Sequence, residues 1–313
     1  MKILITGCAG FIGANFALYL LNSYPEDIIV GVDCLTYAAN DEALSLLLKK
    51  ENFTFYKENI CNAPAMERVF STEKPDVVVN FAAESHVDNS ISNATPFIET
   101  NVRGTQILLD TSLRHEIKRF HQISTDEVYG DLPIDSTNKF HEDSPLNPSS
   151  PYSASKAAAD LLALSYSRTY GLEVSISRST NNYGIFQHKE KLIPMTIGKL
   201  IADEPVPIYG NGENIRDWLC VLDHCRAVDL IIRKGRGEIY NVSANNEWSN
   251  IGLVGQIMRL IGKPDGRIVF VEDRKGHDRK YAVNCDKLRA LGWLPEADFE
   301  RELKSTVEWY VDR

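Results

Sequence analysis

Short runs of apolar, β-branched residues alternate along the chain with longer segments in which apolar residues recur at helical spacing. This alternation is typical of strands and helices that follow one another. Strands are predicted at residues 2–6, 28–33, 53–57, 76–80, 119–124 and 173–177, and helices at residues 11–22, 42–50, 64–73, 96–115 and 153–170. Elements in this order predict an α/β fold with a parallel, doubly wound sheet and right-handed crossovers.

The alternation ends near Thr180, after which loop-forming residues become frequent. This change predicts a smaller lobe that closes over the carboxyl edge of the sheet. Residues 223–233 and 238–242 are predicted as one more helix and strand of the sheet, so the lobe is discontinuous in sequence. We therefore predict a cofactor-binding sheet domain from residues 1–178 and 219–243, and a substrate-binding lobe from residues 179–218 and 244–313.

Composition narrows the classes of partner. The 313 residues, 43% of them hydrophobic, can bury one large core and a smaller appended one. The net charge of -9 argues against nucleic acid as a partner. No apolar run approaches the ~18 residues of a membrane span, and no secretion signal is visible. The six cysteines form no C-x-x-C pair and the histidines lack metal-ligand spacing, so we expect reduced thiols, a cytoplasmic location and no metal.

A glycine-rich turn lies between the first predicted strand and the first predicted helix. In it Gly7 permits a tight turn, Gly10 lets backbone approach a pyrophosphate, and Gly13 lets the helix pack on the strand. Asp33 ends the next strand, where a carboxylate accepts from a ribose 2′-hydroxyl and repels a 2′-phosphate. The pattern predicts that the chain binds NAD rather than NADP. A tight turn without a ligand is the alternative.

Tyr152 and Lys156 lie one turn apart on one face of a predicted helix that begins at Pro151. An ammonium near the phenol, joined by a nicotinamide cation, would lower a phenol pKa that is about 10 in isolation. Tyr152 could then act as a base near neutral pH. A solvated tyrosine and lysine are the alternative. Ser124 or Thr125, at a preceding strand end, favours catalysis because its hydroxyl can bind the same substrate oxygen.

Two adjacent carboxyls, Asp126 and Glu127, follow that strand end, at the edge where open α/β sheets bind ligands. Simple hydride transfer needs only the hydroxyl, the tyrosine and the lysine, so two further carboxyls indicate a second proton transfer. One carboxyl that stays protonated can act as an acid while its neighbour acts as a base. Both reach one substrate only if the backbone turns at the strand end. A solvated acidic loop or a helix N-cap is the alternative.

Over nearly its full length the chain resembles the extended short-chain dehydrogenases/reductases, and among them the family of dTDP-glucose 4,6-dehydratases. The matching segments keep the order of that family and are residues 6–16, 33–38, 82–88, 97–101, 123–131, 148–156, 181–184, 190–194, 215–218 and 276–281. The resemblance implies a Rossmann sheet, a lyase that recycles a bound NAD, and a nucleotide-sugar substrate from deoxysugar biosynthesis.

The resemblance also implies a role for each candidate catalytic residue. Tyr152 would take the proton of the hydroxyl on sugar carbon 4 as hydride passes to NAD, while Thr125 holds that oxygen and Lys156 tunes the phenol. Glu127 would then remove the hydrogen on carbon 5, Asp126 would protonate the departing hydroxyl of carbon 6, and hydride would return to carbon 6. The product would be a 4-keto-6-deoxy sugar.

Two sets of residues would line the ligand sites by the same resemblance. The NAD site would contain Gly7, Gly10, Phe11, Ile12, Gly13, Asp33, Leu35, Thr36, Asn59, Ile60, Ala82, Ala83, Thr100, Tyr152, Lys156 and Asn182. The nucleotide-sugar site would contain Ser85, Thr125, Asn181, Lys191, Leu192, Tyr209, Arg216, Asn250, Arg274 and His277. The chain departs from the family pattern at Cys8, Asn59, Asn89 and Lys275, which leaves the adenine contact and the identity of nucleotide and sugar open.

Other functions share part of the pattern. A nucleotide-sugar 4-epimerase or decarboxylase would use the glycine turn, Tyr152 and Lys156, but has no use for Asp126 and Glu127 as a pair. A dehydratase for UDP-glucose or a related sugar would keep every catalytic residue. An NAD-binding redox sensor would keep the glycine turn but would not need the catalytic set.

The predicted helix at residues 153–170 carries a broad surface of small and apolar side chains, which are Ala154, Ala157, Ala158, Leu161, Leu162 and Ser165. The surface is wider than one sheet face can cover. Packing it with the helix at residues 96–115 against a symmetry mate would give a four-helix interface, as the resemblance also implies. We therefore expect a homodimer.

Overall fold

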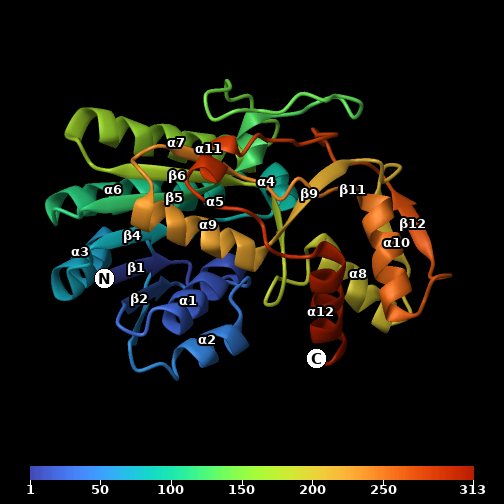
Figure 1. Cartoon of the computed structure of the whole chain (residues 1–313), viewed down its shortest axis with the longest axis horizontal. Helices are drawn as coiled ribbons and strands as arrows, with labels where there is room; N and C mark the ends of the chain where they lie inside the picture. Colours follow the sequence, from blue (N-terminus) through green and yellow to red (C-terminus); the bar gives the residue numbers. More distant parts are fainter.

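The apolar runs of the chain form a seven-stranded sheet in the computed structural model, which describes residues 1–313 (Figure 1). Its strands are β1 (Lys2–Thr6), β2 (Ile28–Asp33), β3 (Phe53–Lys57), β4 (Val77–Asn80), β5 (Arg119–Thr125), β6 (Val174–Ser179) and β10 (Ile239–Val242). Their order is β10-β6-β5-β4-β1-β2-β3, and every neighbouring pair is parallel. The expected doubly wound parallel sheet is confirmed.

Helices cover both faces of this sheet (Figure 1). One face carries α1 (Phe11–Ser23), α2 (Asp41–Leu47) and α9 (Val221–Lys234), and the other carries α3 (Ala63–Glu73), α6 (Thr105–Arg114) and α7 (Pro151–Tyr170). Ile3 and Ile5 belong to the first core and Leu4 to the second, because successive side chains of a strand point to opposite faces. Burial on both faces explains why the strands are continuous apolar runs.

The segment predicted as one helix over residues 96–115 is helical without a break over residues 95–114, but its middle is a π-helical turn that the periodicity did not predict. α4 (Val87–Ser92) precedes α5 (Thr95–Phe97), a π-helical turn η1 (Ile98–Gly104) and α6. Within the wide turn the buried Asn101 side chain accepts from the Glu84 N–H at 2.8 Å and donates to the Glu84 carbonyl at 3.0 Å. Asn101 thus fixes the loop after β4, which fits the frequent occurrence of π-bulges at functional sites.

The smaller lobe is built from two short sheets and three helices, on the right of Figure 1. The strands are β7 (Asn181–Tyr183), β9 (Ile215–Cys220) and β11 (Glu247–Ser249) in one sheet, and β8 (Val206–Tyr209) and β12 (Ile268–Val271) in the other. The helices α8 (Leu192–Ile201), α10 (Asn250–Ile261) and α12 (Phe299–Val311) share one apolar core with them.

Part of the C-terminal chain returns to the sheet domain. Leu288 of α11 (Asp286–Ala290) and Trp293 belong to a buried cluster with Ile231 of α9 and Tyr240 of β10. This segment falls within residues assigned to the lobe from the sequence. None of the helices combines the length and the apolar character that crossing a bilayer requires.

Candidate active site

A continuous cleft follows the carboxyl edge of the sheet and extends to the smaller lobe. Its inner part is lined by the glycine turn, Asp33 and the loops after β3 and β4. Its middle part is lined by the glycine turn, Thr125, Glu127, Tyr152 and Lys156. Its outer part, of about 530 Å³, is shared between the loop after β4 and the lobe. Ser85, Glu127 and Lys191 line both the middle and the outer part, so the two communicate.

The glycine turn has the shape that a pyrophosphate needs. Gly7 has a φ of +67°, and a Cβ there would lie 2.7 Å from the Ala82 nitrogen. A Cβ on Gly13 would lie 2.2 Å from the Gly7 carbonyl oxygen, so α1 can pack on the turn only with glycine there. Gly10 is the N-cap of α1 and no side chain caps the helix. The first N–H groups of α1 are therefore free to bind an anion.

Asp33 connects the turn to the end of β2. Its carboxylate accepts from the Ala9 N–H at 3.0 Å and from the Leu35 N–H at 2.8 Å. Each oxygen keeps a second lone pair, and the residue lines the inner cleft, where it can accept from a ribose hydroxyl. The Asn59 amide oxygen accepts from the Cys61 N–H at 2.8 Å, which leaves the NH₂ group of this cleft residue available as a donor.

Asp33 leads to a first prediction. Wild-type protein should prefer NAD to NADP by at least about tenfold, or ~1.4 kcal/mol, because a 2′-phosphate would be repelled by the carboxylate. Asp33→Ala should shrink this preference. Asp41→Ala, which removes an exposed carboxylate from the start of α2, should leave it unchanged. Isothermal titration with both cofactors measures the ratio, and equal affinities in the wild type would contradict the assignment.

Tyr152 and Lys156 are placed by the first turns of α7, which Ser150 and Ser153 cap reciprocally. Both side chains are buried and line the middle cleft. The Lys156 ammonium donates to the Ile123 carbonyl at 2.6 Å, and burial lowers the pKa of Lys156 to about 8. Lys156 therefore anchors α7 to β5 beside the tyrosine.

Without a cofactor, the surroundings of Tyr152 do not lower the pKa of the phenol, and the expectation of a lowered pKa, which included a bound nicotinamide cation, stays a prediction. Burial raises the pKa of Tyr152 above its ordinary value, and the charges of Glu127 and Asp126 add to the effect. The Thr125 hydroxyl acts in the opposite direction. A phenol in this position becomes a base near neutral pH only when a cation, such as an oxidised nicotinamide, lies beside it.

The backbone turns where β5 ends, which brings the two carboxyls to different environments. The 3-10 turn η2 (Asp126–Tyr129) begins there, and its N-cap is Thr125, whose hydroxyl accepts from the Glu127 N–H at 3.3 Å. Glu127 lines the middle and outer cleft. Asp126 does not line the cleft and is 2% exposed, so the alternative of a solvated acidic loop does not hold for this residue.

The two carboxyls differ in their electrostatic surroundings. Burial, and then the charge of Glu127, raise the pKa of Asp126 well above its usual range, and one of its oxygens has no hydrogen-bond partner. Burial also raises the pKa of Glu127, but the nearby Arg216 and Lys191 oppose this. The pair therefore places a carboxyl whose burial favours the acid form beside one whose charge is favoured by nearby cations, the arrangement that two opposite proton transfers need.

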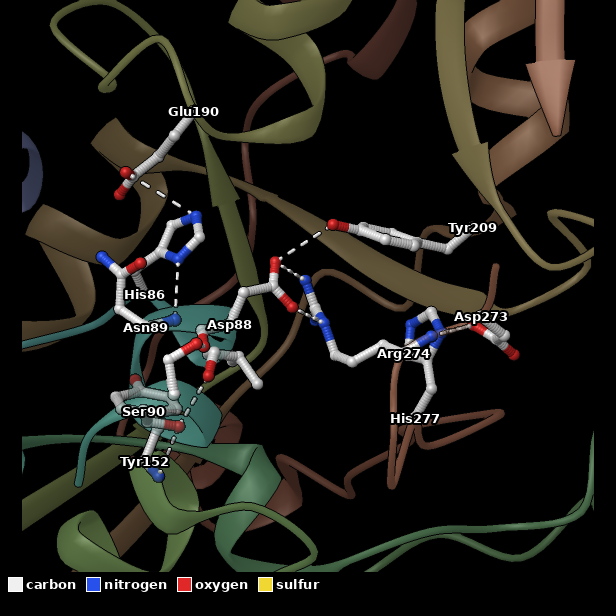
Figure 2. Close-up of polar contacts among 12 residues, drawn as sticks. His86, Asp88, Asn89, Ser90, Tyr152, Glu190, Tyr209, Asp273, Arg274 and His277 are labelled. Carbon is white, nitrogen blue, oxygen red and sulfur yellow. Dashed lines mark hydrogen bonds and ion pairs between the residues drawn. The ribbon is translucent and has the colours of Figure 1, made fainter. Parts of the chain in front are cut away.

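Three basic side chains line the outer cleft. Arg216 donates to the backbone carbonyls of Ile215 and Asp278, both at 2.8 Å, and its guanidinium lies 4.3 Å from the centre of the Tyr281 ring. Lys191 donates to the Ser85 carbonyl at 2.9 Å. The third, Arg274, pairs with the Asp88 carboxylate, as Figure 2 shows. These cations can bind an anion in a protein whose overall charge is negative.

Comparison with known proteins identifies the family. Residues 4–306 match the family model described as GDP-mannose 4,6 dehydratase. The chain belongs to this family. It is 46% identical to a dTDP-glucose 4,6-dehydratase of Haemophilus influenzae over 99% of the chain and 98% of the relative. It is 47% identical to the low-salt glycan biosynthesis protein Agl12 of Haloferax volcanii over 99% of both chains.

Solved structures of similar proteins include members with different reactions. DesIV of Streptomyces venezuelae, a dTDP-glucose 4,6-dehydratase crystallised with NAD, has a TM-score of 0.96 and 42% identity over 100% of this chain and 98% of its own. A UDP-glucose 4-epimerase of Thermotoga maritima has a TM-score of 0.92 and 30% identity over 100% and 99%. The fold is therefore common to dehydratases and epimerases, and only the site distinguishes them.

The residues expected to hold ligands in this family member are distributed along the cleft. Of the expected NAD set, all but Leu35 line its inner or middle part, and Leu35 contributes its N–H to Asp33. Of the expected nucleotide-sugar set, all but Thr125 line the outer part, and Thr125 lies in the middle part.

Several residues of the site were missed from the sequence. His86, Asp88, Glu190 and Tyr281 line the outer cleft. Each lies in a segment that matches the family, but no short sequence motif indicated that it lines the site. A second group lies behind Lys156, where the buried Asp160 accepts from Arg178 at 2.9 Å. The charge of Asp160 opposes the effect of burial on the pKa of Lys156. This pair belongs to no recognisable motif.

A second depression, of about 520 Å³, lies at the opposite, amino edge of the sheet and is not a good candidate site. Its charged groups are already paired, since Lys118 binds Asp76, Arg119 binds Glu173, and Arg233 binds Asp27. Ligands of doubly wound sheets bind at the carboxyl edge.

Proposed function

We propose that the protein is an NAD-dependent nucleotide-sugar 4,6-dehydratase that converts dTDP-glucose to its 4-keto-6-deoxy sugar. The observation that carries the proposal is the pair of carboxyls at the end of β5, in which a buried Asp126 with a raised pKa stands beside Glu127 in the cleft. An epimerase or a redox sensor has no use for this pair. The high identity with several dTDP-glucose 4,6-dehydratases supports the same choice.

The residues that line the inner and middle cleft fit NAD, since the glycine turn leaves room for the pyrophosphate and Asp33 accepts from a ribose. When bound there, NAD supplies a hydride acceptor for carbon 4 and later a hydride donor for carbon 6. In the first step Tyr152 removes the proton from the hydroxyl on carbon 4, and the Thr125 hydroxyl holds the same oxygen. Lys156 keeps α7 in position through the Ile123 carbonyl.

Elimination of water follows from the ketone at carbon 4, which acidifies the hydrogen on carbon 5. Glu127 takes this proton as the base and returns it to carbon 5 when hydride reaches carbon 6. Asp126, whose acid form burial favours, gives its proton to the departing hydroxyl of carbon 6. Arg216 and Lys191, which have no carboxylate partner within 4 Å, would hold the diphosphate.

A panel of substrates tests this proposal. Purified protein should convert dTDP-glucose to a product with the strong alkaline absorbance of a 4-keto sugar, without added reductant. UDP-glucose is the main competitor, because a UDP-sugar dehydratase would use the same catalytic residues. Faster turnover of UDP-glucose would support the dehydratase reaction but identify UDP, rather than dTDP, as the nucleotide of the substrate. Interconversion of dTDP-glucose and its 4-epimer, with no keto product, would exclude the dehydratase reaction.

A homodimer through α6 and α7 is part of the proposal. Leu161 and Tyr170 on α7 are 58% and 61% exposed, and Ile98 of η1 is 55% exposed. Ala157, assigned to this surface from the sequence, is buried inside the protein instead. The protein should elute as a dimer in light scattering at micromolar concentration, and Leu161→Glu should yield monomers. A wild-type monomer would contradict the prediction. The six free cysteines are compatible with the cytoplasm as the location.

A further inference from the structure

Arg274 is bound by an internal carboxylate from the other side of the cleft. Its Nε and Nη2 atoms donate to the two oxygens of Asp88 at 2.6 and 2.9 Å, and the Tyr209 hydroxyl donates to Asp88 at 3.2 Å. The guanidinium also lies 5.1 Å from the centre of the Tyr209 ring. Figure 2 shows the carboxylate between Arg274 and Tyr209, which both come from the smaller lobe.

Asp88 lies on α4, a helix that several contacts hold in place. It lies in the first turn of α4, whose N-cap, His86, accepts from the Asn89 N–H at 3.3 Å and lies 3.6 Å from the Glu190 carboxylate. Ser90 of the same helix accepts from the Tyr152 N–H at 3.1 Å, which ties α4 to the start of α7 (Figure 2). Asp88 is thus held relative to the catalytic tyrosine, while Arg274 follows β12 in the lobe.

This pairing distinguishes Arg274 from the other two cations of the outer cleft. Arg216 and Lys191 donate only to backbone carbonyls, so an anion can approach them without displacing a negative charge. Two N–H groups of Arg274 face Asp88, and both side chains line the cleft. An anionic ligand that binds the edge of the Arg274 guanidinium facing Asp88 must displace the Asp88 carboxylate. A ligand that does not displace it must place its own negative charge beside that carboxylate.

We infer that Asp88 competes with the diphosphate of the nucleotide sugar for Arg274, and thereby sets the affinity of the site. This inference rests on the proposed function, which supplies the diphosphate. Both groups are charged at neutral pH. The bonds and charge of Arg274 outweigh burial and lower the pKa of Asp88, and Asp88 in turn raises the pKa of Arg274 despite burial. On arrival of the ligand Arg274 turns to the diphosphate, and on its departure Asp88 binds Arg274 again.

Weakened binding is useful in a site that must release its product. A cleft with three free cations would hold any nucleoside diphosphate, product included. Since the substrate and the product share the same diphosphate, a competitor inside the protein weakens both to the same extent and favours exchange. Asp88 is therefore a determinant of affinity and of product release, and it takes no part in the chemistry.

A double-mutant cycle tests this inference. Thymidine diphosphate and uridine diphosphate are titrated calorimetrically into NAD-loaded wild type, Asp88→Asn, Arg274→Gln and the double variant. Asp88→Asn keeps the size of the side chain and an acceptor for Tyr209, but removes the negative charge and one of the two acceptors that hold Arg274. The better-bound nucleotide should then bind about threefold to tenfold more tightly, the range for partly exposed ion pairs. In the Arg274→Gln background the same substitution should change affinity less than twofold.

The possible outcomes separate this inference from the proposed function. If the wild type binds neither nucleotide, the proposed function fails and the inference fails with it. If it binds one but Asp88→Asn binds it equally or more weakly, the inference alone is overturned. A gain that persists in the Arg274→Gln background would also overturn it, since it would reflect only the loss of a nearby negative charge. Asp88→Ala serves as a second variant and should show the same gain.

Discussion

Replacement of Glu127 by Gln should stop the reaction after oxidation, so that reduced cofactor accumulates on the protein. The amide cannot remove the proton on carbon 5, while Tyr152 and Lys156 remain in place to support oxidation at carbon 4. Turnover should fall by roughly 10²–10⁴-fold, the usual effect of removing an acid or a base. Stopped-flow absorbance should show bound NADH that forms and persists.

Replacement of the neighbouring acid, Asp126, should have the same effect. Asp126→Asn should also accumulate bound NADH, because the hydroxyl of carbon 6 then departs without a proton. Burial holds the pKa of Asp126 well above its usual range, which favours the acid form, and that form is lost as the pH rises through the raised pKa. Glu308→Gln, an exposed change on α12, should leave turnover intact. Wild-type turnover in both carboxyl variants would favour an epimerase over a dehydratase.

Replacement of Tyr152 by Phe should prevent the oxidation itself. The ring keeps its packing against Phe97, but no base remains for the hydroxyl on carbon 4. Substrate should then leave the bound NAD unreduced, and turnover should fall by roughly 10²–10⁴-fold.

Tyr166→Phe provides the matched control for this variant. It removes a phenol hydroxyl from the same helix, where that group donates to Asp110 on α6, outside the cleft. It should turn over normally. Formation of bound NADH in Tyr152→Phe at the wild-type rate would show that another group is the base.

The sheet and the order of its helices could be predicted because their signals are local. A strand covered on both faces is an apolar run, and the glycine turn is set by steric limits within a few residues. The π-helical turn at residues 98–104 could not be predicted, because the bonds of Asn101 to Glu84 that accompany it lie outside the helical periodicity.

For the same reason, only part of the site could be predicted from the sequence. The types of Tyr152, Lys156, Asp126 and Glu127 indicated proton transfer, but their charge states depend on burial, which periodicity does not report. The raised pKa of the phenol is one consequence. The pairing of Asp88 with Arg274 joins residues 186 positions apart, and no local pattern connects them.

The dehydratase and the epimerase, which share this fold, differ in where hydrogen goes after carbon 4 is oxidised. In an epimerase it returns to carbon 4. In the dehydratase proposed here the elimination between carbons 5 and 6 intervenes, and the reaction stays neutral in redox terms without an external reductant. The carboxyls at the end of β5 are needed only in the second case.

The most direct measurement is therefore the fate of a label. dTDP-glucose deuterated at carbon 4 is converted in ordinary water, and the product is analysed by mass spectrometry and NMR. The account predicts deuterium at carbon 6. In heavy water, unlabelled substrate should gain deuterium at carbon 5, because the proton on Glu127 exchanges with solvent. A product without deuterium at carbon 6, or with the label still at carbon 4, would contradict the dehydratase assignment.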